Sequence, residues 1–314
     1  MHCPNTGPMV GLVGTRADRR ITLPTGDVKT VRAQASDRGL APTHSPHPHI
    51  TSYAVLPRVQ VSEGAQVLMS DAGPASRRKC RFSLEWMRPA ASREWVGVHS
   101  ANANPIAHAL LTRGLVPGLE DPTSVQREVP IKPGTRVDFQ IVHKRGATAA
   151  STFLEVKSVT LAVEARDLVQ RGGAEGSLGM RDESRVALFP DTVSDRALRH
   201  VQDLHEIVLH RRDSRGVVLF VIQRGDCEAF APSWEHDPTY SAVLSRAVRA
   251  GMPALAARCR LTRDPTRAKE EGRGYQVEFS GLVPVDTSLG QCGSEEMAKV
   301  GRTVVRLCWM LELR

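Results

Sequence analysis

The sequence predicts a mixed α/β (α+β) protein whose core elements follow the order αβββαβ. Three observations support this fold class. A helix with clear end signals begins near Asn104, short strands that carry acidic residues follow it, and the apolar run 217–222 has the composition of a strand buried on both faces. The chain has 314 residues, 41% of them hydrophobic, which allows one sizeable core and a small additional domain.

The first helix is predicted from the signals at its two ends. Asn104 is a favourable N-cap, Pro105 suits the first helical position, and Gly114 follows the last apolar residue. Apolar residues at 106, 109 and 110 fall on one side. We therefore expect a helix that starts at Asn104 and packs one face against the core.

Three strands are predicted next, and the last two carry the candidate acids Asp138 and Glu155. An amphipathic stretch at 125–131 comes first, and Asp138 and then Glu155 lie in the two strands that follow. Because side chains alternate along a strand, Glu155 and Lys157 project the same way. The polar segment at 143–146 predicts a hairpin loop that brings Asp138 back beside Glu155.

The acidic strands therefore predict a site in which two carboxylates and an ammonium group converge. Such a group can hold a divalent metal ion against a phosphate. Burial of Leu154 and Val156 on one face of the strand leaves the charged residues on the other face. The alternative is that Asp138, Glu155 and Lys157 form an exposed ion pair on an ordinary hairpin.

The second half of the core is predicted from a helix and a buried strand. The helix covers about 192–210, opens with a capping-box spacing from Thr192 to Asp195, and has a one-sided apolar stripe. The strand at 217–222 ends at Gln223. Ligands of open α/β sheets usually bind at such strand ends, so Gln223 is a candidate site residue.

One more helix is expected to cover the core. Asp237 provides its N-cap, Pro238 its first position and Gly251 its end.

Composition points to a protein that meets a polyanion. The formal charge is +8 and the pI is near 9.5, which favours phosphate backbones over acidic partners. No apolar run approaches the length of a membrane span. Six cysteines without paired spacing argue against a disulfide scaffold and indicate a reducing compartment, with Cys227 expected to be a packed thiol.

The densest basic cluster is the predicted nucleic-acid contact. It consists of Arg77, Arg78, Lys79 and Arg81, with Phe82 available to stack on a base. A solvated basic linker is the alternative. On the helix at 192–210, Arg196, Arg199 and His200 either extend the binding groove or form its solvent face. The histidines at 44, 47 and 49 are separated by prolines, and we expect a loop there and no metal site.

Taken in order, several short blocks resemble the sugar fermentation stimulation protein family over most of the chain. The blocks are residues 2–9, 127–129, 136–139, 155–161, 187–191, 223–227, 230–232 and 237–238. The resemblance implies DNA binding, an N-terminal OB-like domain and a C-terminal restriction-endonuclease-like domain with a PD-(D/E)xK signature. Asp138, Glu155 and Lys157 fall on that signature.

The resemblance also implies a division of the chain. We expect an OB-like domain at 1–88 with an insertion near 15–55, a restriction-endonuclease-like domain at 89–286 with an insertion near 162–185, and a C-terminal extension at 287–314. Family members usually have some tens of residues ahead of the block at 2–9, including the first strands of the barrel. We therefore expect the small β-barrel to be incomplete.

The chemistry that follows is Mg²⁺- or Mn²⁺-dependent hydrolysis of a phosphodiester. Asp138, Glu155 and the carbonyl of Val156 would hold the metal, Lys157 would orient the attacking water, and Gln223 would orient the nucleophile or bind phosphate. Replacing either acid should abolish cleavage and preserve DNA binding.

Two alternatives stay open. One is a non-catalytic DNA-binding regulator of sugar metabolism on a nuclease scaffold. The other is a pseudo-enzyme whose shortened OB-like module no longer binds. The expected partner is DNA with low sequence specificity, RNA is an open alternative, and no membrane is involved. We expect a cytoplasmic, nucleoid-associated protein in a bacterium, or an organellar or nuclear one in a eukaryote.

Overall fold

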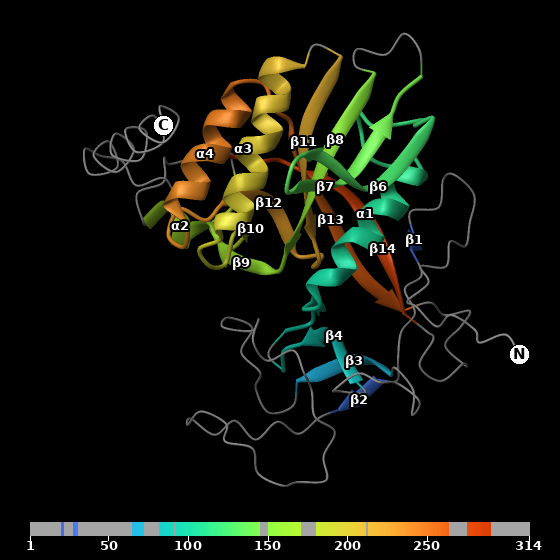
Figure 1. Ribbon diagram of the computed structural model, residues 1–314. Coiled ribbons are helices and arrows are strands. Elements are labelled where there is room, and N and C mark those ends of the chain that lie inside the picture. The colour runs from blue at the N-terminus through green and yellow to red at the C-terminus, as the bar shows by residue number, and fades with distance from the viewer. Residues whose placement is uncertain are drawn as a thin grey trace, which may run out of the picture.

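A seven-stranded mixed sheet forms the core of the protein (Figure 1). The computed structural model describes residues 20–21, 28–30, 65–71, 82–90, 92–144, 150–170, 180–211, 213–263 and 275–289. From one edge to the other the strands are β1 (Arg20–Ile21), β14 (Tyr275–Val283), β13 (Ala254–Arg263), β11 (Ser214–Ile222), β8 (Ser151–Val159), β7 (Thr135–Val142) and β6 (Ser124–Lys132). β11 runs parallel to β8 and β13, and the other neighbours are antiparallel.

Helices cover both faces of this sheet. α1 (Ala103–Thr112) packs Ile106 and Leu110 on one face, and α3 (Asp195–His210) and α4 (Pro238–Arg249) pack on the other. β11 shows the division most clearly, because its odd-numbered residues from Val217 to Val221 join the α1 side and its even-numbered ones the α3 and α4 side. The prediction of a strand buried on both faces is confirmed. The fold is the predicted mixed α/β class.

The helix ends agree with the sequence at α4 and differ at α1 and α3. Asp237 caps α4 by accepting a hydrogen bond from the Tyr240 amide. In contrast, the predicted N-cap of α1 is wrong: the helix follows a 3₁₀ turn, η2 (Ser100–Asn102), whose helical geometry lets α1 start before Asn104. α3 is capped by Ser194, two residues after Thr192.

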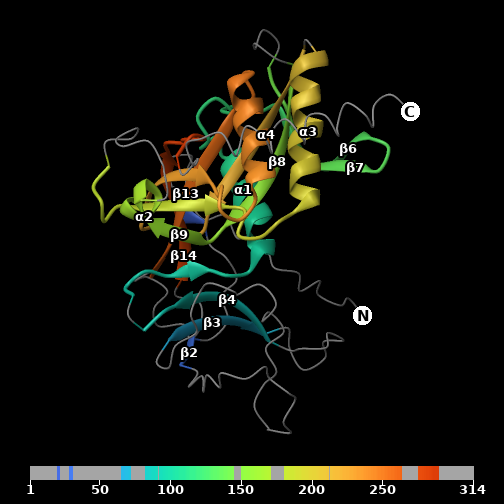
Figure 2. The ribbon, with the colours of Figure 1, turned by 90° about the vertical axis from the view of Figure 1, so that its left-hand side faces the viewer.

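A small antiparallel sheet lies below the core in Figure 2. Its strands are β2 (Val28–Thr30), β3 (Gln66–Asp71), β4 (Phe82–Arg88) and β5 (Val96–Gly97). The Gly97 amide donates to the Gln223 carbonyl at 2.8 Å, and the Gly225 amide donates to Glu94 Oε1 at 2.9 Å. Elsewhere in 1–88, Arg20–Ile21 form β1 of the core sheet, and nearly all the remaining residues fall outside the described ones, so the OB-like barrel stays a prediction.

A three-stranded sheet flanks the core where we expect an insertion. It contains β12 (Cys227–Pro232), β10 (Arg185–Phe189) and β9 (Leu161–Glu164), and the short helix α2 (Ala165–Gln170) follows β9. Leu168 of α2 is buried against Val186 and Leu188. Part of the segment at 162–185 therefore forms packed secondary structure, whereas 171–179 lie outside the described residues.

Two further predictions concern cysteines and membranes. Cys227 and Cys259 are buried free thiols, and the other four cysteines lie outside the described residues. Burial raises the pKa of the Cys227 thiol to about 12, as befits a packed and unreactive side chain. None of the helices in the described ranges combines the length and apolarity that crossing a bilayer requires.

Candidate active site

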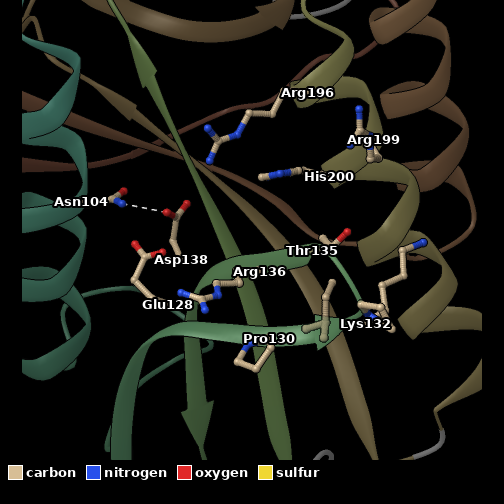
Figure 3. A pocket seen from close by; sticks show the side chains of 13 residues that line it. Asn104, Glu128, Pro130, Lys132, Thr135, Arg136, Asp138, Arg196, Arg199 and His200 are labelled. Atoms are coloured by element: carbon tan, nitrogen blue, oxygen red, sulfur yellow. Dashed lines mark hydrogen bonds between the residues drawn. The ribbon is translucent and has the colours of Figure 1, made fainter.

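At the point where β7 and β8 separate, the Asp138 carboxylate accepts the hydrogen bond of a β8 amide that would otherwise bond to the backbone of β7. The antiparallel ladder ends at the pair Phe139–Leu154. Beyond it, the Val156 amide donates to Asp138 Oδ2 at 2.7 Å, and Asn104 Nδ2 donates to Asp138 Oδ1 at 2.7 Å (Figure 3). The carboxylate is thus held by the neighbouring strand and by α1.

Glu155 lies beside this point on the face of β8 that α3 and α4 cover. Glu155 is only 4% exposed. Lys157 Nζ donates to Glu155 Oε1 at 2.7 Å, and His200 Nδ1 of α3 makes a short hydrogen bond with the same oxygen. The expected shared face of Glu155 and Lys157 is confirmed, but α3 closes over it, so both side chains are buried.

Within the described part of the chain, the second oxygen of Glu155 has no hydrogen-bond partner. Oε2 is buried and, among the described residues, nothing donates to it. The Tyr240 hydroxyl of α4 is likewise buried without a partner. A buried carboxylate oxygen without a donor is costly, so the site is incomplete by itself and suits a cationic ligand.

The two carboxylates interact electrostatically. Burial raises the pKa of Asp138 above its ordinary value, and the negative charge of Glu155 raises it further. Burial alone would also raise the pKa of Glu155, but the hydrogen bonds and positive charges of His200 and Lys157 lower it. Glu155 is therefore ionised at neutral pH beside a second acid, an arrangement that a bound cation would stabilise.

A pocket of about 820 Å³ opens beside Asp138 (Figure 3). Asn104 of α1, the β6–β7 hairpin and the first turns of α3 line it. His200 reaches the pocket, so it links the pocket to buried Glu155. Four cationic side chains also line the pocket: Lys132, Arg136, Arg196 and Arg199.

The donor set fits a hard divalent cation. The described residues contain no group of three or more His, Cys, Asp or Glu side chains that could hold a metal. Two carboxylates and a backbone carbonyl nevertheless suffice for Mg²⁺, which keeps several waters. The amide and carbonyl of one strand residue point to the same neighbour, so the Val156 carbonyl faces the side where the ladder has ended.

Comparison with known proteins agrees with this architecture. The family model described as "Sugar fermentation stimulation protein RE domain" matches residues 101–265. A sugar fermentation stimulation protein homolog of Synechococcus elongatus is 34% identical over 210 residues, which cover 67% of this chain and 72% of the relative. The chain belongs to the sugar fermentation stimulation protein (SfsA) family. A homolog from Citrifermentans bemidjiense is 31% identical over 204 residues, which cover 65% of this chain and 76% of the relative.

A solved SfsA structure has the same fold. The structure of Pyrococcus furiosus SfsA in complex with Ca²⁺ gives a TM-score of 0.52 at 19% identity and covers 72% of this chain and 79% of that one. The mixed α/β fold predicted for this chain is thereby confirmed, because the SfsA structure shares it.

Gln223 is not brought to the acidic pair. Val218 lies beside Glu155 and Ile222 beside Val159, so Gln223 continues well beyond the level of the acids. It is fully buried, and its Nε2 donates to Ser158 Oγ at 2.7 Å. Gln223 packs so closely on β5 that a Cβ on Gly97 would lie 2.7 Å from its Oε1.

The predicted nucleic-acid contact lies almost entirely outside the described residues. Arg77, Arg78, Lys79 and Arg81 lie outside the described residues, and of Phe82 only the backbone, the start of β4, is described. Three residues that contribute to the site were missed: Asn104, Tyr240 and Glu128. The sequence position of Tyr240 indicates only a core-facing residue of a helix. The interpretation of Asn104 as an N-cap gave no reason to expect its hydrogen bond to Asp138.

Proposed function

We propose that this SfsA protein binds DNA with little sequence preference and hydrolyses its phosphodiester bonds with Mg²⁺ or Mn²⁺ as cofactor. One observation carries the proposal. Glu155 Oε2 is buried and has no partner among the described residues, at a point where Asp138, Lys157 and the Val156 backbone meet beside a pocket with a cationic lining. In a bacterial host, we expect the protein to act on the nucleoid in the cytoplasm.

Asp138, Glu155 and the Val156 carbonyl would hold the cofactor. When bound, the ion would supply polarisation of a phosphoryl oxygen and a water of lowered pKa. The Pyrococcus furiosus relative was solved with Ca²⁺, a hard cation that shares the preference of Mg²⁺ for oxygen ligands, which supports this assignment.

The protein's own groups have separate tasks. Asn104 and the Val156 amide fix the orientation of the Asp138 carboxylate. Lys157 would orient the attacking water and offset negative charge on the phosphorus centre. His200 positions Glu155 by binding the oxygen that Lys157 also contacts, which leaves Oε2 for the cation.

The second candidate is a DNA-binding regulator that does not cleave. The observation in its favour is that Glu155 Oε1 already has two donors, an arrangement also found in purely structural ion pairs. Under either function the segment at 77–82 is a proposed contact for DNA or RNA. Alanine at its four cations should weaken binding and make it less sensitive to salt.

A metal titration separates the two candidates. Purified protein is titrated with Mg²⁺ and Mn²⁺ against labelled single-stranded DNA, duplex DNA and RNA, and both binding and cleavage are scored. Asp138→Asn and Glu155→Gln, which preserve side-chain size, should abolish cleavage and retain binding. Salt-sensitive binding without cleavage by the unmodified protein would support the regulator, and unchanged cleavage by both variants would contradict the assigned acids.

A further inference from the structure

We infer that the pocket beside Asp138 is a phosphate-binding subsite for a single polynucleotide strand, with Arg136, Arg196 and Arg199 as its phosphate ligands. The inference rests on the proposed function for the identity of the anion. It adds which residues hold the strand and which form of nucleic acid enters the pocket.

All three arginines lack an ionic partner among the described residues. They are exposed, line one pocket and make no ion pair or hydrogen bond within the part of the chain that the structure describes. Other arginines of the core do have partners: Arg224 donates to Asp226 at 2.6 Å, and Arg260 to Glu278 at 3.2 Å. Three unpaired guanidinium groups around one pocket favour an external anion, and their planar fork suits phosphate oxygens.

The three arginine side chains face the acidic site, as their positions on α3 and β7 show. Residues 196, 199 and 200 are spaced i, i+3 and i+4 on α3 and therefore share a face. That face points to the acids, because His200 is bonded to Glu155. Arg136 is two residues before Asp138 on β7 and projects to the same side. In Figure 3 the guanidinium groups of Arg136 and Arg196 lie on opposite sides of the Asp138 carboxylate.

An acidic side chain also lines the pocket. Glu128 of β6 lies near Asp138 in Figure 3. Two acids, half-buried Asp138 and exposed Glu128, therefore line the same pocket as the arginines. This mixture of charges suits a phosphate held at the acids by a bridging cation, with the neighbouring phosphates of the same strand on the arginines.

The walls of the pocket are tied together, which favours one strand over a duplex. Lys132 at the end of β6 contacts Asp203 Oδ1 at 2.5 Å and Glu206 Oε2 at 3.4 Å on α3. Arg211 Nη2 also donates to the Ile131 carbonyl at 3.3 Å. The pocket volume of about 820 Å³ is typical of sites that enclose a small ligand. A single strand can follow such a pocket, whereas two paired strands cannot pass between its joined walls.

Binding without divalent metal tests the inference independently of cleavage. Fluorescence anisotropy is measured with a labelled oligothymidine of about ten nucleotides in EDTA. Arg136→Ala, Arg196→Ala and Arg199→Ala are each expected to weaken binding about tenfold. Each should also reduce the slope of log affinity against log salt by about 0.7. Arg246→Ala is the matched control, because Arg246 is exposed on α4 and does not line the pocket.

Each outcome decides one part of the inference. Pocket variants that bind as tightly as Arg246→Ala would overturn the subsite. A hairpin duplex of the same sequence should bind more weakly than the single strand and respond less to the pocket variants. An equal response would overturn the preference for one strand. If the unmodified protein never cleaves but the pocket variants still lose affinity, the nuclease proposal fails and the subsite stands.

Discussion

His200 Nδ1 is hydrogen-bonded to Glu155 Oε1, which ties helix α3 to the central sheet at the acidic site. His200→Ala would leave Lys157 as the only donor that the described residues offer to this buried carboxylate. We expect the free energy of unfolding to fall by about 2 kcal/mol. His200→Asn, whose amide nitrogen can occupy the position of Nδ1, should recover most of the loss. Urea denaturation measures both, and equal stability of the two variants would contradict the role of this contact.

The lowered pKa of Glu155 leads to a predicted dependence of stability on pH. Its folded pKa is below the ordinary value of 4.5, because His200 and Lys157 outweigh the effect of burial. An acid with a lowered pKa contributes stability above its unfolded pKa, and this contribution is lost as the pH falls through the folded pKa. The difference in unfolding free energy between the unmodified protein and Glu155→Gln should therefore be constant near neutral pH and shrink below 4.5. A difference that grows on acidification would show that the sign is wrong.

Asp138 combines a structural and a chemical task. Asp138→Ala leaves both the Val156 amide and Asn104 without their acceptor. Asp138→Asn retains one acceptor oxygen, so it should be more stable than Asp138→Ala by about 1–2 kcal/mol. Thermal and urea unfolding of the pair provide the measurement. Both variants should lose cleavage, and only the alanine variant should also lose stability markedly.

Glu128 adopts an unusual backbone conformation beside the pocket. Its φ is 53°, and it falls between the ladder pairs Arg127–Phe139 and Val129–Val137, across from Asp138. A side chain at positive φ costs about 1 kcal/mol, which glycine avoids. Glu128→Gly should therefore be more stable than Glu128→Ala by about that amount in urea denaturation. Alanine is the matched control because it removes the carboxylate and retains the backbone cost.

Local sequence signals predicted the parts of the fold that depend on neighbours in the chain. Asp237 and Pro238 gave the start of α4, and the continuous apolar run gave β11 with its two buried faces. Alternation along β8 gave the shared face of Glu155 and Lys157. These features follow from helix capping and strand geometry, which a short window of sequence contains.

The features that sequence could not predict depend on packing across the sheet. His200 reaches Glu155 only because α3 lies over β8, a contact between residues 45 positions apart. Asn104 has the residue type of an N-cap, and only the preceding η2 turn frees its side chain for Asp138. Gln223 follows a buried strand, as ligand-binding residues often do. Gly97 of β5, however, packs directly against its side chain.

The contacts of Gln223 and Gly225 with β5 and Glu94 give the block at 223–227 a role in assembly. This block docks the N-terminal sheet on the core, whereas Asp138 and Glu155 form a separate group of side chains. Substitutions at the acids would leave these docking hydrogen bonds in place, so the joining of the two sheets is separable from the chemistry of the site.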